Sequence, residues 1–250
     1  MTIASYRLPM WSALLLWFAV WEIVGHAEIT KLVPPISAII LAFGEVTSTK
    51  SFREAIGVTL QAFGLGMSLS LVVGISVGVA MGRNKVVADV MGMWINIFES
   101  SPISAVVPLL LAVIGFGMST MVITVFLFSV WVIALDTQVG VQHANRSLLE
   151  MARSFGASPR QVFSKIVFWA ALPEILAGIR LGVVRGVKGL IIGQLLIAIV
   201  GMGYLFQTYS RRFLMPEFWA VVLIVFGFAY LLSEIIGVFE RRVARYASAR

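Results

Sequence analysis

The chain has 250 residues, of which 60% are hydrophobic and only 12% carry a charge, and its mean hydropathy is +0.97. Ordinary soluble domains carry about 25% charged residues, so this composition excludes a soluble globular protein. The apolar stretches are continuous rather than alternating, which favours an all-α polytopic membrane protein over a transmembrane β-barrel.

Residue content also excludes several kinds of chemistry. The absence of cysteine excludes disulfides, thiol catalysis and cysteine-based metal sites. The two histidines, His26 and His143, lie in different regions of the chain, so no metal site is predicted. The net charge of +7 is attributed to membrane-anchoring loops rather than to nucleic acid binding, because basic residues concentrate in cytoplasmic loops of membrane proteins.

Six apolar segments are predicted to span the membrane, since a helix needs roughly 20 apolar residues to cross a bilayer. They are 10–27, 57–82, 86–115, 119–141, 174–201 and 217–239. No soluble domain fits in the connections. We therefore expect one transmembrane domain, 1–250, in which 1–53 forms the first span and a periplasmic segment and 54–245 forms the core.

The first span has two interpretations. Arg7, the apolar core and Gly25-His26-Ala27 resemble a signal peptide with a small-x-small cleavage site. Three tryptophans and Glu22 within the apolar core favour a retained helix, and we predict that the helix is retained. Cleavage would leave the orientation of the other five spans unchanged.

Glycines recur every four residues in the second and fifth spans. They are Gly74, Gly78 and Gly82, and Gly178, Gly182 and Gly186. This spacing places the glycines on one face of each helix, where two helices can approach closely. Close packing within the membrane is the first interpretation, and faces that slide during a conformational cycle are the alternative.

The third span is interrupted by two prolines. Pro102 disfavours helix at Ser101, and Pro108 removes a backbone donor. A helix broken at membrane depth is tolerated where its backbone lines a cavity, and in transporters such breaks often lie near the substrate path. Glu99 and Pro102 are therefore candidates for a substrate path, with a simple proline kink as the alternative.

Basic residues predict the orientation. With the N-terminus inside, eleven Lys and Arg residues fall in the inner segments and five in the outer ones. The remaining three, Arg180, Arg185 and Lys188, lie in or near the fifth span. This bias predicts that both termini are cytoplasmic. The polar loop 147–173, between the fourth and fifth spans, then also faces the cytoplasm.

The loop 147–173 carries the most distinctive motif in the chain. Glu150, Met151 and Ala152 are followed four residues later by Gly156. This pattern resembles the EAA motif of permease subunits in binding-protein-dependent ABC importers. The middle alanine of the motif is replaced by Met151.

The resemblance extends beyond this loop. The third-span region 102–117 and the fifth-span region 178–205 are similar to signatures of the nitrate/sulfonate/taurine branch, and the likeness covers about 54–245. One departure is Phe168-Trp169 in place of the first Leu-Pro of the motif, whereas a second is kept as Leu172-Pro173. The departure concerns the geometry at the end of the loop more than its role.

The resemblance implies that a short coupling helix in this loop docks on an ATP-hydrolysing subunit. Ser158 is a good N-cap and Pro159 suits the first helical position. Phe155, Val162 and Phe163 are expected to bury apolar area there, and basic residues to add charge complementarity. The predicted coupling residues are Glu150, Ala152, Arg153, Gly156, Ala157, Ser158, Pro159, Arg160 and Phe163. An amphipathic helix resting on anionic headgroups is the alternative.

Basic residues of the fifth span are candidates for the substrate path, because ionisable groups at membrane depth are costly. Arg185 and Lys188 share a helix face and would attract an anion if they face the interior of a dimer. The resemblance adds Gln194, which stands where the branch often has Glu. The alternative is that Arg180 extends to the cytoplasmic interface while the other two cations pair with Glu99, Asp136 or Glu234.

The sequence has no phosphate-binding loop of the Gly-x-x-x-x-Gly-Lys-Ser/Thr type, so no enzymatic activity and no cofactor are predicted for this chain. The resemblance implies the transmembrane subunit of an ATP-driven importer in the bacterial cytoplasmic membrane. Its implied partners are a second permease copy, two ATPase subunits that hold ATP and Mg, a periplasmic or lipid-anchored substrate-binding protein, and lipid.

The predicted solute is a small anion of the sulfonate or taurine, nitrate or bicarbonate, or aromatic acid type. A neutral heterocycle such as a pyrimidine is the alternative for the same kind of importer. An ion-coupled secondary transporter is the alternative from a different class, although acidic residues, which such a protein would need for coupling, are sparse in the spans.

Overall fold

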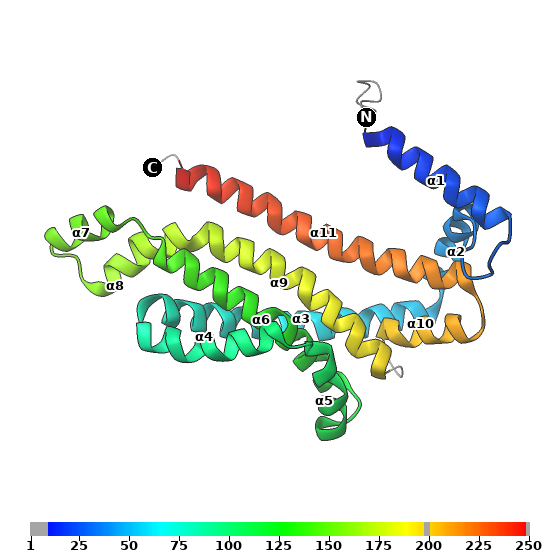
Figure 1. Cartoon of the computed structure of the whole chain (residues 1–250), viewed down its shortest axis with the longest axis horizontal. Helices are drawn as coiled ribbons and strands as arrows, with labels where there is room; N and C mark the ends of the chain where they lie inside the picture. The colour runs from blue at the N-terminus through cyan, green and yellow to red at the C-terminus, as the bar shows by residue number, and fades with distance from the viewer. Residues whose placement is uncertain (1–9, 198–200, 249–250) are drawn as a thin grey trace, which may run out of the picture.

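The computed structural model describes residues 10–197 and 201–248, and every regular element within them is helical (Figure 1). The elements are α1 Met10–His26, α2 Ile36–Ser48, α3 Lys50–Arg83, α4 Lys85–Ser100, η1 Ile103–Ala105, α5 Val106–Ile114, α6 Met118–Gln142, α7 Arg146–Ser154, α8 Pro159–Val162, η2 Phe163–Val167, α9 Phe168–Ile197, α10 Gly201–Arg211 and α11 Met215–Ser248. The long helices α3, α6, α9 and α11 form an elongated bundle.

Within the described residues, four helices are long and apolar enough to cross a membrane. They are Lys50–Arg83, Met118–Gln142, Pro159–Leu196 and Met215–Arg242. The pair Lys85–Ser100 and Ile103–Ile114, bent by 82°, counts as a fifth if it forms one broken span. The prediction of an all-helical protein with several apolar helices is confirmed. The predicted number of six spans is not confirmed. The apolar part of α1 in the described chain, Ser12–His26, is shorter than a span.

The helices that contain the second and fifth predicted spans begin earlier than those spans, because polar turns extend them. Helix α3 begins at Lys50 rather than at 57, since the Thr49 side chain caps it by accepting a hydrogen bond from the Phe52 N–H at 3.1 Å. The fifth span begins before 174, because α8, the π-helical turn η2 and α9 follow one another without a break. Its predicted end includes residues 198–200, which lie outside the described residues.

Two helices were not predicted at all. Helix α2 has 13 residues and α10 has 11, so neither reaches the length of a span. Helix α2 packs against α11, and α10 contacts α3, α9 and α11. Both lie at the end of the bundle opposite to α7 and α8 (Figure 1).

Helix α6 lies between α3 and α9, and all six glycines of the repeated pattern contact it. A Cβ atom built on Gly78 would lie 2.5 Å from the carbonyl oxygen of Ala134, and one built on Gly182 would lie 2.8 Å from the Ile133 side chain. The Ser129 hydroxyl also donates to the Gly182 carbonyl at 2.8 Å. Close approach of these helix backbones, the first interpretation of the pattern, is confirmed.

The α4–η1–α5 segment, here called the arm, is attached more loosely. The predicted interruption of the third span is a sharp break, with an angle of 82° between its two halves. Ile95 is the buried residue of α4, and Val107 that of α5. Leu109 and Val113 are 62% and 76% exposed, and α5 projects from the bundle in Figure 1.

Candidate functional sites: the α7–α8 turn and a charged face of α9

Helix α7 lies at one end of the bundle (Figure 1), and it carries an exposed apolar stripe. Asn145 is its N-cap, and the Asn145 side chain accepts a hydrogen bond from the Ser147 N–H at 3.0 Å. Leu148, Met151 and Phe155 follow at helical spacing and are 41%, 51% and 84% exposed. An exposed apolar stripe rimmed by polar residues is suited to docking.

A glycine turn ends α7. The Gly156 N–H donates to the Arg153 carbonyl at 2.9 Å, and the Ala157 N–H donates to the Ala152 carbonyl at 3.0 Å. These are the two hydrogen bonds of a Schellman motif. Gly156 has a φ of 76°, in the left-handed region where a residue with a Cβ atom is strained. The spacing between Ala152 and Gly156 in the motif therefore fixes where the helix ends.

Helix α8 begins with a reciprocal cap. The Ser158 hydroxyl accepts a hydrogen bond from the Gln161 N–H at 3.4 Å, and the Gln161 side chain accepts one from the Ser158 N–H at 2.8 Å. Pro159 occupies the first turn, so the predicted start of this helix is confirmed. Because backbone groups on both sides of the turn are hydrogen-bonded, α7 and α8 are held in a defined relative position.

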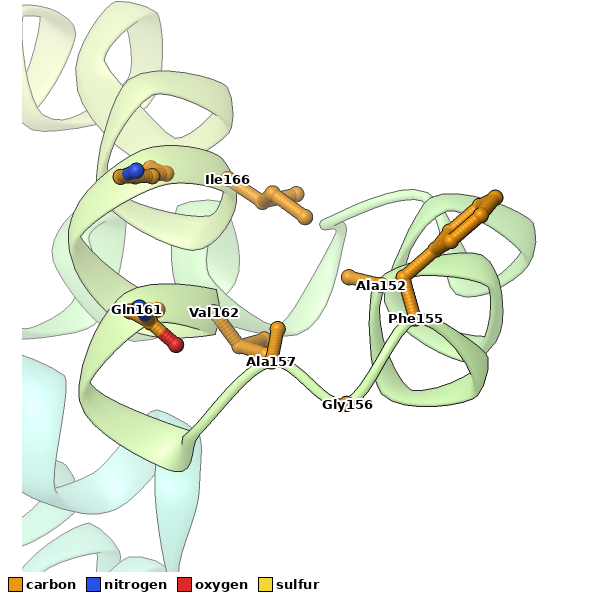
Figure 2. A pocket seen from close by; sticks show the side chains of 8 residues that line it. Ala152, Phe155, Gly156, Ala157, Gln161, Val162 and Ile166 are labelled. Atoms are coloured by element: carbon orange, nitrogen blue, oxygen red, sulfur yellow. The ribbon is translucent and has the colours of Figure 1, made fainter.

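A pocket of about 340 Å³ lies between α7 and the start of the long helix (Figure 2). Apolar and polar residues line it together: Ala152, Phe155, Gly156, Ala157, Gln161, Val162, Lys165 and Ile166. Figure 2 shows Ala152 and Ile166 pointing into the space between the helices, whereas the Phe155 ring points outward. The turn thus offers a small pocket of mixed polarity beside an exposed aromatic ring.

The predicted coupling residues differ in their availability to a partner. The exposed ones are Glu150, Arg153, Gly156, Ser158, Pro159 and Arg160, and Ala152 and Ala157 are half-buried. Val162 is buried within the chain, and the half-buried Phe163 ring lies under the Arg83 guanidinium, 5.1 Å from its carbon. Of the three apolar side chains expected to dock, only Phe155 is prominently exposed, whereas Leu148 and Met151 extend the surface.

The second candidate site contains Arg185, which forms an ion pair. Its Nη1 atom donates to both carboxylate oxygens of Glu99, with a distance of 2.6 Å to Oε2. The pair joins α9 to the last turn of α4, and the two side chains are 40% and 25% exposed. The structure therefore brings together two predicted path residues, in the pairing that the alternative interpretation expected.

Lys188 lies one turn further along α9. Its side chain is exposed, and it forms no ion pair within the part of the chain that the structure describes. Glu174, Leu181, Lys188 and Leu195 are all exposed and follow at intervals of seven residues, so they lie on one face of the helix. This face is called the α9 stripe below.

Arg180 is tied to α11 instead. Its Nη2 atom lies 3.3 Å from Glu234, its Nη1 atom lies 3.6 Å from Glu240, and its Nε atom donates to the Ser233 hydroxyl at 3.3 Å. These contacts link the two helices. They give Arg180 a structural role in place of the extension to the interface that the alternative interpretation expected.

Two acidic residues in the cluster around Asp136 and the Arg185–Glu99 pair, Asp136 itself and Glu174, were missed as site residues. Asp136 packs against a glycine of α9 and lies close enough to Glu99, Glu174 and Arg185 for electrostatic interaction. The sequence analysis named Asp136 only as an alternative partner of the cations. The four residues lie on α4, α6 and α9, so only the packing of these helices reveals the cluster. The signal in the sequence that could have indicated this cluster is the presence of acidic residues inside apolar segments.

Gln194 and Pro102 lie apart from this cluster. Gln194 is 1% exposed; its Nε2 atom donates to the Thr59 hydroxyl at 2.9 Å, and its Oε1 atom accepts from the Gly203 N–H at 3.3 Å. The Met202 N–H donates to the same hydroxyl at 3.1 Å. These bonds fasten the start of α10 to α3 and α9. Pro102 is exposed at the break between α4 and η1.

These features define a class of protein: a multi-span helical membrane protein that carries charged groups along its bundle and a capped, partly apolar turn at one end. Residues 70–245 match the family described as "Binding-protein-dependent transport system inner membrane component". This match covers more than half of the chain, and the chain belongs to that family. It is therefore a permease subunit of an ABC importer.

Curated relatives differ in the solute that their names give. The taurine transport system permease protein TauC of Escherichia coli (strain K12) is 25% identical over 90% of this chain and 84% of its own length. The nitrate import permease protein NrtB of Synechocystis is 25% identical over 86% and 81%. The formylaminopyrimidine transport permease protein ThiX of Halalkalibacterium halodurans is 26% identical over 86% and 88%.

Solved structures share the fold. A chain of the MetNI methionine ABC transporter in an inward-facing conformation aligns with a TM-score of 0.63 and 19% identity, covering 79% of this chain and 96% of that one. A chain of an amino acid ABC transporter aligns with a TM-score of 0.64 and 19% identity, covering 80% and 97%.

Proposed function

We propose that this permease subunit forms the path for a small oxyanion, of the sulfonate or nitrate type, across the bacterial cytoplasmic membrane. The observation that carries the proposal is Lys188, an exposed cation without an ion-pair partner in the described chain, within a membrane-length helix. The relatives named for taurine and nitrate handle solutes of this chemistry. The α7–α8 turn couples the path to ATPase subunits.

The position of Lys188 supports a path. It lies nine residues before the end of α9 at Ile197, which corresponds to about 14 Å of helix. A charged amine at this depth is costly in lipid, so it faces a water-filled path or a second copy of the chain. In a dimer with two-fold symmetry, the α9 stripes of the two copies face each other and place two Lys188 side chains beside the path.

The α7–α8 turn supports a coupling role. Its exposed Phe155 ring suits a groove on a partner, and the exposed Arg153 and Arg160 provide positive charge around the ring. Pro159–Leu196 is one continuous helix, so a displacement of the turn is carried directly to Arg185 and Lys188. Closure of two ATPase subunits on ATP and Mg would then rock the path helices.

The proposed assembly contains two permease copies, two ATPase subunits and an external substrate-binding protein. In this proposal α7, α8 and both termini lie in the cytoplasm, which the excess of basic residues in the inner segments supports. The α2 and α10 end of the bundle then faces the binding protein. ATP hydrolysis belongs to the partner subunits, and selectivity is shared with the binding protein.

Substitution of Gly156 tests the coupling role. Gly156→Val forces a β-branched residue into the left-handed conformation, which costs about 1–2 kcal/mol and opens the turn. Gly156→Asn is the matched control, because asparagine tolerates this conformation. We expect the valine variant to lose co-purification of a co-expressed ATPase subunit and the asparagine variant to keep it. A folded valine variant that keeps the ATPase and its solute-stimulated hydrolysis would show that the turn does not couple the subunits.

Substitution of Lys188 tests the oxyanion path. Lys188→Gln removes the charge and Lys188→Arg retains it, so uptake of labelled taurine or nitrate by the complete importer should fall by about tenfold only in the first variant. Immunoblots of the membrane fraction control for abundance of the permease. Equal uptake by both variants at equal abundance contradicts an anion path and favours a neutral solute, the class named by the formylaminopyrimidine relative.

A further inference from the structure

The ion pair of Arg185 leaves most of its guanidinium available. Nη1 contacts both oxygens of Glu99, whereas Nε and Nη2 form no hydrogen bond with any residue that the structure describes. The side chain is 40% exposed, so these donors are accessible. A guanidinium edge with two free nitrogen donors matches an oxyanion that presents two oxygens side by side, as nitrate, sulfonate and carboxylate do.

Glu99 lies where the arm is held to the bundle. It is in the last turn of α4, next to the 82° break. Ile95 is the buried residue of that helix, and the Phe98 ring stacks on the Trp131 ring of α6 with centroids 4.6 Å apart. The ion pair is therefore one of the few contacts that hold this end of α4 in place.

Arg185 lies on the fixed side of the pair. The neighbouring glycines Gly182 and Gly186 pack directly on α6, and a Cβ atom on Gly186 would lie 2.5 Å from the Ser129 hydroxyl oxygen. Helix α9 cannot shift here without disturbing α6. If the pair separates, the carboxylate on α4 is the partner that moves.

We propose that the Arg185–Glu99 ion pair is a latch that the transported oxyanion opens. This inference rests on the proposed anion path. An oxyanion that arrives at Lys188 reaches the free Nε and Nη2 donors of Arg185, one turn away, and competes with Glu99 for the guanidinium charge. Asp136 already adds negative potential beside Arg185, so a third anion is accommodated by release of Glu99. Release frees the end of α4 and lets the arm move when solute is present.

A single cysteine placed at Ile95 reports whether α4 is held. Ile95 is 0% exposed and the native chain has no cysteine, so Ile95→Cys in the complete importer should react slowly with N-ethylmaleimide while the latch is closed. Met93→Cys, at a position that is 55% exposed, gives the rate for unprotected α4. Sodium nitrate and sodium methanesulfonate serve as probes. Sodium chloride at equal ionic strength is the control, because chloride offers one acceptor atom in place of two oxygens side by side.

In the Ile95→Cys background, Glu99→Ala should raise the labelling rate by about tenfold without any added anion, as expected for loss of a half-buried ion pair that holds one of two states. Asp136→Asn is the matched control: it removes a nearby negative charge without breaking the pair, and it should leave labelling slow. The exchanged pair Glu99→Arg with Arg185→Glu should restore slow labelling and lose the response to nitrate.

The latch is supported if nitrate or methanesulfonate accelerates labelling and chloride does not. Slow labelling in Glu99→Ala overturns it, because the ion pair then does not hold α4. The latch is also overturned if Glu99→Ala labels fast but neither oxyanion accelerates labelling of Ile95→Cys with its native ion pair. The pair is then a fixed tether. Failure of the proposed anion path is seen separately, as unchanged uptake by Lys188→Gln.

Discussion

Helices α6 and α4 are both apolar, yet they are held in the molecule in different ways. Helix α6 has twelve buried residues between α3 and α9, whereas α4 has one, Ile95. Glycines that face α6 meet its backbone or side chains closely, while a Cβ atom on Gly92 of α4 would meet nothing within 4 Å. Helices α3, α6 and α9 are called the frame below. Lipid is as apolar as these side chains, so close backbone approach rather than hydrophobicity distinguishes the frame from the arm.

The largest expected effect comes from filling a glycine contact in the frame. Gly78→Leu would place its Cβ atom 2.5 Å from the Ala134 carbonyl and the Thr137 Cβ atom, and overpacking of this kind costs at least about 1–3 kcal/mol. We expect little folded protein in the membrane, measured as detergent-extractable monodisperse permease.

Gly92→Leu is the matched control on the arm. It adds the same side chain at a position where a Cβ atom has no neighbour within 4 Å. It also replaces a poor helix former by a good one. Its extractable yield should equal that of the native chain. An equal loss of protein in both variants would mean that α4 is packed as closely as α6, and the distinction between frame and arm would fail.

Much of the fold could be predicted because its signals are local. The glycine spacing on α3 and α9 indicated which faces approach another helix, and Pro102 indicated the break. The first turn of α3 was missed because Lys50 and Glu54 are polar, and hydropathy does not register a helix that extends into water. Helices α2 and α10 were missed because they are too short to be recognised as spans.

The two candidate sites differ in how well the sequence predicts them, because one is built from local contacts and the other from contacts between distant segments. The α7–α8 turn is built from hydrogen bonds within a few residues, such as the pair between Ser158 and Gln161, so its motif in the sequence is also its structure. Glu99 and Arg185 are 86 residues apart, and their contact depends on the packing of three helices. Sequence reasoning could name both residues and their possible pairing but could not choose between a free and a paired arginine.

A smaller effect is expected when a buried isoleucine is truncated in each region. Ile133 of α6 and Ile95 of α4 are both 0% exposed, so burial alone predicts equal costs. Truncation to alanine costs about 2–5 kcal/mol in soluble cores, and less in lipid, where mainly the cavity and the lost contacts contribute. Ile133 fills the space between Gly74 and Gly182, so Ile133→Ala should lower the thermal midpoint of the purified permease.

Ile95→Ala should act locally. Because few other contacts hold α4, its truncation should raise amide hydrogen exchange in 85–100 while the thermal midpoint and the exchange of α6 stay close to native values. Hydrogen exchange resolved by peptide distinguishes this result from global destabilisation. If Ile95→Ala instead lowers the midpoint as much as Ile133→Ala and raises exchange throughout α6, the arm unfolds together with the frame. The arm would then not be a separately mobile element.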